Sequence, residues 1–248
     1  MSRAHEPDRD AARGAELAGN LAGITARIGA ACAAAGRDAS EITLIAVTKT
    51  RPASDVLALA ALGLRDFGEN RDQEAAPKAV VVRGGDPRGS AITWHFIGQL
   101  QTNKARSVVG YADVVHSVDR VRLARALGAA ARQERRGRPL ACLVQVSLDG
   151  DQARGGVPAG EIGRVAEAIE AEPGLALAGV MTVAPLGIPP ETAFAPLRAI
   201  SATLRATNPA ATVISAGMSG DLESAVRHGA THLRIGTALL GNRTPPVL

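Results

Sequence analysis

The sequence predicts an α/β fold, a (β/α)8 barrel of the triosephosphate isomerase (TIM) type, in which eight parallel strands close into a cylinder. Apolar, β-branched runs alternate with helical patterns from residue 42 to residue 235, which is typical of parallel βαβ units. Eight such units fit one domain in a chain of 248 residues. No G-x-G-x-x-G follows the first strand, which disfavours a dinucleotide-binding fold. An open, doubly wound sheet is the alternative, because strand count alone does not prove closure.

The first half of the chain supplies an extra N-terminal helix and four βα units. An amphipathic pattern over residues 15–36 predicts a helix that Gly36 ends, since glycine readily adopts the left-handed conformation after a helix. Pro52 opens the next helix and Gly63 closes it. A glycine-rich loop is expected at 84–89. Strands are predicted at 42–47, 64–68, 92–97 and 113–116, and helices at 52–62, 71–78, 103–110 and 120–136.

The second half repeats this pattern, with strands predicted at 140–146, 175–183, 211–215 and 232–235, and helices at 159–171, 191–206 and 221–228. We expect residues 15–248 to form one barrel domain after a disordered tail of residues 1–14. The tail is polar and lacks the apolar segment of a signal peptide. No run approaches the roughly 18 apolar residues of a membrane span. We therefore expect a cytoplasmic protein with no membrane segment.

Charge and composition disfavour nucleic acid and metal as ligands. The net charge is +4, but the arginines are spread along the chain and aromatic residues make up only 2% of it. A nucleic-acid groove would need clustered cations and stacking aromatics. No pair of histidines has metal-ligand spacing, and neither has the pair of cysteines, so we expect no metal site.

Lysine is scarce in this chain, which draws attention to Lys49. Of 28 Lys and Arg residues only three are lysine, namely Lys49, Lys78 and Lys104. Arginine can replace lysine as a surface charge, but it cannot form an imine. Lys49 follows the first predicted strand, and chemistry in such a barrel belongs at the carboxyl ends of strands. We interpret Lys49 as an amine for Schiff-base chemistry rather than an ordinary strand-end cation.

The loops after the last two strands predict an anion site. Residues 215–220 are mostly small, so backbone N–H groups can approach an anion before the next helix begins. Gly236 and Thr237 follow the eighth strand in the same way and add a hydroxyl. Each loop alone could be a plain turn with a serine N-cap. Together, at the usual barrel location for phosphate, they indicate a phosphate site.

Other polar residues carry weaker signals. Arg234 can only donate hydrogen bonds, so it suits a ring nitrogen that accepts one, although an ion-paired arginine is the simpler alternative. Asn70 could contact a ligand or cap the helix that follows. His95 lies in an apolar strand and is expected to be a hydrogen-bonded core residue. Tyr111, the only tyrosine, lies between a helix and a strand, away from the carboxyl-end rim.

Six blocks of sequence together point to a family: 47–50, 65–71, 94–104, 116–119, 217–219 and 234–238. In order and at matching intervals they resemble the pyridoxal 5′-phosphate homeostasis proteins (YggS/PROSC type), and D-F-G-E-N and W-H-F-I-G are the most specific. The resemblance implies the barrel found as the N-terminal domain of alanine racemase. It also implies pyridoxal 5′-phosphate (PLP) covalently bound to Lys49 as a Schiff base. Further cofactor contacts implied by the resemblance are Asn70, Met218, Ser219, Arg234, Gly236 and Thr237.

The chain departs from the family pattern in two places. Ala216 replaces a methionine in the loop after the seventh strand, which is a small change. Arg154 stands where the family usually has a lysine, so a cationic role is kept and an amine role is not.

The resemblance implies a PLP-binding protein of vitamin B6 homeostasis rather than an enzyme that turns over an amino acid. An amino-acid racemase is the alternative, but racemisation needs a second base, and the rim offers no tyrosine. A cofactor-free Schiff-base aldolase is a further alternative, which would be colourless. PLP-dependent apo-enzymes are candidate partners, and without a second domain we expect a monomer.

Overall fold

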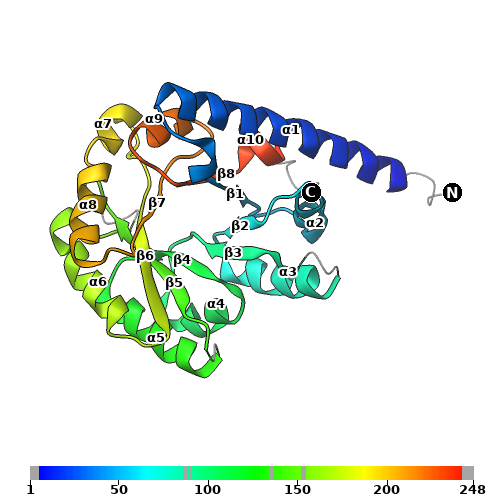
Figure 1. The fold of residues 1–248 in the computed structure, drawn as a ribbon. Coiled ribbons are helices and arrows are strands. Elements are labelled where there is room, and N and C mark those ends of the chain that lie inside the picture. Colours follow the sequence, from blue (N-terminus) through cyan, green and yellow to red (C-terminus); the bar gives the residue numbers. More distant parts are fainter. Residues whose placement is uncertain (1–5, 86–88, 90, 135–136, 152–154, 242–248) are drawn as a thin grey trace.

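The computed structural model contains a closed barrel of eight parallel strands, which confirms the predicted fold class. It describes residues 6–85, 89, 91–134, 137–151 and 155–241. The barrel order follows the chain, from β1 beside β2 to β8 beside β1 (Figure 1). The strands are β1 (Thr43–Val47), β2 (Asp66–Glu69), β3 (Thr93–Phe96), β4 (Val114–Val118), β5 (Leu140–Val146), β6 (Leu175–Thr182), β7 (Val213–Ser215) and β8 (His232–Ile235).

Helices surround the strands and follow the predicted order with a few differences. The helices are α1 (Glu6–Ala34), α2 (Ala53–Ala61), α3 (Asp72–Gly85), α4 (Ala105–Tyr111), α5 (Val121–Glu134), α6 (Ile162–Glu170), α7 (Pro190–Phe194), α8 (Leu197–Thr207), α9 (Leu222–Arg227) and α10 (Thr237–Leu240). Short 3-10 turns stand at Ala39–Glu41, Thr102–Lys104 and Ala159–Glu161.

The larger differences from the sequence prediction lie in α1, α3 and the α7–α8 segment. Helix α1 begins at Glu6, so most of the segment that we expected to be a disordered tail is helical. Helix α3 continues to Gly85, into the expected glycine-rich loop. The helix predicted over 191–206 is divided into α7 and α8 next to Pro196, because proline has no N–H to donate within a helix.

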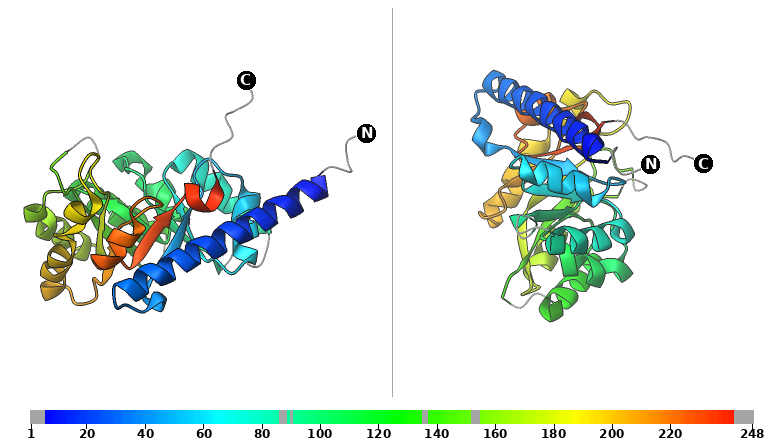
Figure 2. Two further views of the ribbon diagram at one scale, coloured as in Figure 1. Left: turned by 90° about the horizontal axis from the view of Figure 1, so that it is seen from above. Right: turned by 90° about the vertical axis from the view of Figure 1, so that its right-hand side faces the viewer.

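Helix α1 lies across the outside of the barrel, beside α9 and α10, and its N-terminal end projects beyond them (Figure 2). Within the described residues it is the one helix long and apolar enough to cross a membrane by length and composition. Its polar side chains, however, bind the barrel. Arg13 pairs with Asp55, and Asn20 donates to the carbonyl of Leu239. These contacts account for the helix as a packed element of the fold.

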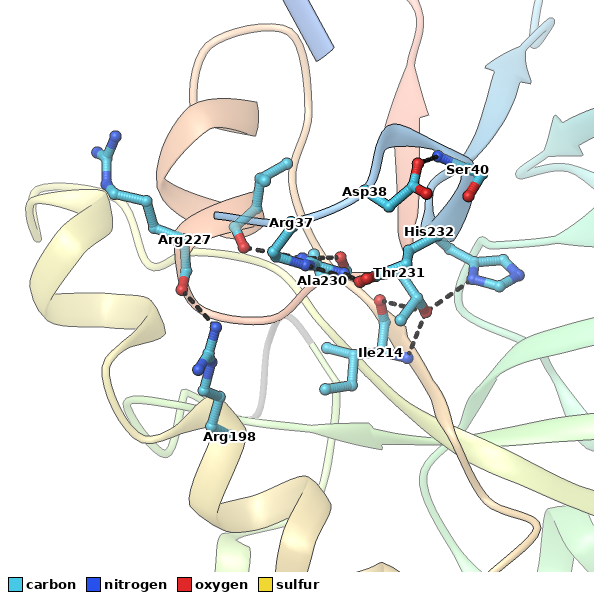
Figure 3. A network of polar contacts seen from close by, with 11 residues as sticks. Arg37, Asp38, Ser40, Arg198, Ile214, Arg227, Ala230, Thr231 and His232 are labelled. Carbon is cyan, nitrogen blue, oxygen red and sulfur yellow. Dashed lines mark hydrogen bonds and ion pairs between the residues drawn. The ribbon is translucent and has the colours of Figure 1, made fainter. Parts of the chain in front are cut away.

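The turn after α1 is anchored to the start of β8 (Figure 3). The guanidinium of Arg37 donates to the carbonyls of Val226 and Ala230, at 2.8 and 2.7 Å. Thr231, next in the chain, contacts the Ile214 amide and the His232 ring, both at 2.9 Å. These bonds fix the last strand against the N-terminal segment.

Strand alternation separates an apolar shell from a polar barrel interior. Phe67 and Trp94 are fully buried and pair across β2 and β3, with ring centroids 6.2 Å apart. Their neighbours Gly68 and His95 also pair, and they point to the opposite face, into the barrel. At Gly68 a Cβ atom would meet the Ile45 side chain at 3.0 Å, so glycine makes room there. The interior can therefore hold polar side chains.

Candidate functional site

Lys49 lies at the carboxyl-end rim of the barrel, two residues beyond the end of β1, as predicted. It lines a small pocket together with Gly236 and Thr237, so the structure brings the predicted amine and the predicted loop after β8 together. The next residue, Thr50, has a φ of 63°. A β-branched residue rarely adopts this left-handed conformation, and such strain gathers at functional sites. The Thr50 amide donates to Glu74 at 3.0 Å, which helps to hold the loop.

A buried ion pair supports the backbone just before Lys49. The Lys78 ammonium of α3 lies 2.6 Å from Glu69 Oε1, and both side chains are almost fully buried, with exposed fractions of 8% and 0%. The same ammonium donates to the Thr48 carbonyl at 2.8 Å, and the Thr48 hydroxyl donates to Glu69 Oε1 at 2.7 Å. Buried charges are tolerated when they are paired and hydrogen-bonded in this way. Sequence reasoning placed Lys78 on a helix but missed this role.

The loop between β7 and α9 carries Met218 and Ser219. Gly217 has a φ of 94°, and a Cβ there would meet Ala225 at 2.6 Å, so the loop needs glycine at this point. The Ser219 hydroxyl accepts a bond from the Ala238 amide at 3.3 Å, which joins this loop to the one after β8. The Met218 side chain is 39% exposed at the surface. The loop after β7 and the loop after β8 are thus joined at Ser219 and Ala238.

Arg234 is a buried cation inside the barrel, 4% exposed. It donates to the Ser215 hydroxyl at 2.6 Å and to the Thr182 carbonyl at 2.8 Å. Burial lowers the pKa of the guanidinium to about 10. Because this value is still well above neutral pH, the group remains charged. Among the described residues these bonds occupy two of the five N–H donors of the guanidinium.

Asn70 lies apart from the pocket that Lys49 lines. It borders a neighbouring pocket at the ends of β2 and β3, beside Phe96 and Gln99. Its Oδ1 atom is buried and has no hydrogen-bond partner among the described residues. This free acceptor is available to a ligand, but the structure does not group Asn70 with Gly236 and Thr237.

Two further residues that the sequence analysis singled out, His95 and Tyr111, are buried. His95 is a buried, hydrogen-bonded core residue, as predicted, between Asp66 and His116 at 2.9 Å each. Tyr111 is buried at the end of α4, and burial raises the pKa of its phenol. Arg154 lies outside the described residues. No group of three or more His, Cys, Asp or Glu in the described part of the chain is arranged to hold a metal ion.

The chain is similar to known proteins over nearly its whole length. The family described as alanine racemase, N-terminal domain, matches residues 20–244, so the chain belongs to this class of barrel proteins. Within it, the chain is 43% identical over 249 residues to the pyridoxal phosphate homeostasis protein of Mycobacterium tuberculosis H37Rv, covering 96% of this chain and 95% of that one. The homologue of that name from Escherichia coli K12 is 36% identical over 236 residues, covering 92% and 97%. The chain is a member of the pyridoxal phosphate homeostasis protein family.

Solved structures agree with this assignment. PipY of Synechococcus elongatus PCC7942, a structure with PLP bound, has a TM-score of 0.77 and 33% identity, covering 91% of this chain and all of that one. Alanine racemase of Corynebacterium glutamicum has a TM-score of 0.65 at 18% identity. It covers 95% of this chain but only 62% of the racemase, and at this identity the likeness shows the shared fold alone.

Proposed function

We propose that this protein binds PLP covalently as a Schiff base on Lys49 and acts in intracellular vitamin B6 homeostasis rather than in turnover of an amino acid. The observation that carries the proposal is the shared pocket of Lys49, Gly236 and Thr237, in a chain closely related to PLP homeostasis proteins. Bound PLP would supply an aldehyde that reacts with an amine, and Lys49 is the lysine that lines this pocket with Gly236 and Thr237.

The other predicted site residues would each contact a different part of PLP. Gly236, Thr237 and Ser219 would hold the phosphate, since the loops that carry them are joined and offer backbone N–H groups and hydroxyls. Arg234 would donate to the pyridine nitrogen and keep it unprotonated, because a charged guanidinium cannot accept a proton. Asn70 would contribute its free amide oxygen, and Met218 would cover the cofactor from the surface.

Among the described residues no tyrosine lies at the rim to act as a second base for racemisation. Tyr111, the only tyrosine, is buried at the end of α4. We therefore propose that the protein does not racemise alanine at a substantial rate. We also propose that it works in the cytoplasm as a monomer and exchanges PLP with apo-enzymes.

The direct test is to incubate purified protein with PLP, record its absorption, reduce it with borohydride and locate the adduct by mass spectrometry. Violet absorption and an adduct on Lys49 are expected. The Lys49→Arg variant keeps the charge and should give no adduct and weaker binding. A colourless wild-type protein with Lys49 unmodified would overturn the proposal, and an adduct on Lys78 or Lys104 would overturn the role of Lys49. Measurable turnover of D- or L-alanine would overturn the non-catalytic function.

A further inference from the structure

A row of hydrogen-bonded side chains crosses the barrel interior and ends at Arg234. Arg234 of β8 contacts Ser215 of β7, and the Ser215 hydroxyl lies 3.0 Å from Nδ1 of His116 on β4. Nε2 of His116 lies 2.9 Å from Nδ1 of His95 on β3, and Nε2 of His95 lies 2.9 Å from Asp66 Oδ1 at the start of β2. Ser215, His116 and His95 are all buried.

When both rings are neutral, the ends of this row fix the direction of every hydrogen bond. A guanidinium can only donate, and a carboxylate can only accept. Arg234 donates to the Ser215 oxygen, so the hydroxyl hydrogen is left for the Nδ1 atom of His116. His116 then carries its hydrogen on Nε2 and donates it to Nδ1 of His95, which in turn donates from Nε2 to Asp66. Both rings are neutral Nε2–H tautomers in this assignment.

The surroundings of His116 agree with a neutral ring. Burial, and then the nearby positive charge of Arg234, lower the pKa of His116 well below its ordinary value. The His232 ring, which Figure 3 shows at the start of β8, lies 6.4 Å from His95. Among the described residues none places a carboxylate in ion-pair contact with Arg234, so Asp66 at the far end is the negative group of the row.

We propose that Asp66, His95, His116 and Ser215 are positioning residues that act through this one-way relay. The relay holds the Arg234 guanidinium in one orientation and leaves its free N–H donors facing the bound cofactor. This inference rests on the proposed function, since Arg234 is taken as the partner of the pyridine nitrogen. It adds that Asp66, at the amino end of β2 and so at the end of the barrel opposite the proposed cofactor site, influences how the cofactor is held.

The first arm of the test uses protein without cofactor, so it does not depend on PLP binding. Long-range proton–nitrogen NMR spectra at pH 7.5 should show His95 and His116 as Nε2–H tautomers. In the Ser215→Ala variant His116 loses the donor to Nδ1 and should become a mixture of tautomers. An Nδ1–H tautomer of His116 in the wild type, or no change in Ser215→Ala, would overturn the relay even if PLP binds. If PLP does not bind, the proposed function fails while this arm still decides the relay.

The second arm measures PLP dissociation and the absorption of bound PLP. Ser215→Ala should release PLP about tenfold faster, as expected for loss of one hydrogen bond to a charged group. Asp66→Ala, far from the cofactor, should change both readouts in the same direction, and Asp66→Asn, which keeps an acceptor for His95, should restore them to within about twofold. Ser117→Ala is the matched control, because Ser117 is equally buried and its hydroxyl has no partner among the described residues. If Ser215→Ala and Asp66→Ala behave like Ser117→Ala, the positioning role is overturned.

Discussion

The Lys78 ammonium donates a 2.8 Å hydrogen bond to the carbonyl of Thr48, the residue directly before Lys49. Because the same ammonium neutralises Glu69 at 2.6 Å, one buried lysine fixes the end of β1 just before Lys49. Two of the three lysines of the chain thus work together, one as support and one as the proposed cofactor ligand.

Replacing Lys78 should lower the free energy of unfolding. Lys78→Met leaves the Glu69 carboxylate buried and unpaired, which should lower the free energy of unfolding by about 3 kcal/mol in urea titrations. Combining Lys78→Met with Glu69→Gln should recover part of that loss, since the unpaired charge is gone. Lys104→Met is the control: Lys104 is 38% exposed and lies 3.9 Å from Asp72, so the loss should stay below about 1 kcal/mol. Equal losses in Lys78→Met and Lys104→Met would contradict this account.

The glycine of the β7–α9 loop should not tolerate a side chain. Gly217→Ala puts a Cβ into contact with Ala225 and Leu233 at a positive φ, so it should destabilise the protein by about 2 kcal/mol and weaken PLP binding. Gly220→Ala, three positions later, meets nothing within 4 Å and should behave like the wild type. Thermal unfolding and PLP titration of both variants make the comparison. A Gly217→Ala protein as stable as Gly220→Ala would show that the loop does not depend on this conformation.

Acid should destabilise the barrel through His116 and His232. Burial lowers the pKa of His116 well below 6.5, and that of His232 to about 4, so the unfolded chain binds more protons than the folded one at pH values below about 6.5. The free energy of unfolding should therefore be highest above that pH and should fall on acidification, by up to about 1.4 kcal/mol per pH unit for His116. Urea unfolding at a series of pH values measures the slope. His232→Gln should flatten it between about pH 6.5 and 4, and an unchanged slope would exclude His232 as a contributor.

Helix α1 should contribute to phosphate binding through Arg27, whose guanidinium donates to the Ser219 carbonyl at 3.2 Å and pairs with Glu223 at 2.8 Å. Arg27→Gln should weaken PLP binding about threefold, because the proposed phosphate loop loses a brace. Arg122→Gln, on an exposed position of α5, is the control and should bind as the wild type does. Titration with PLP compares them, and equal affinities would rule out the brace.

The fold was predictable because alternating strand and helix patterns are visible in short stretches of sequence. The rule that chemistry lies at the carboxyl ends of barrel strands also predicted that Lys49 lies near Gly236 and Thr237. The ion pair of Lys78 and Glu69 was not predictable in this way, since it joins a helix and a strand at a separation that no motif marks. The relay from Arg234 to Asp66 depends on how the strands align around the cylinder. Helix α10, with four residues, is too short to leave a periodic pattern.

Helix α1 has a consequence for how the chain acquires its structure. Its bonds to Ser219, Leu239 and Leu240 join residues 192, 219 and 227 positions apart in the sequence. Since synthesis proceeds from the N-terminus, α1 leaves the ribosome well before the loops that it binds, and it cannot dock until those loops have been made. Such long-range contacts slow folding. We therefore expect α1 to dock onto the barrel in one of the last steps of folding.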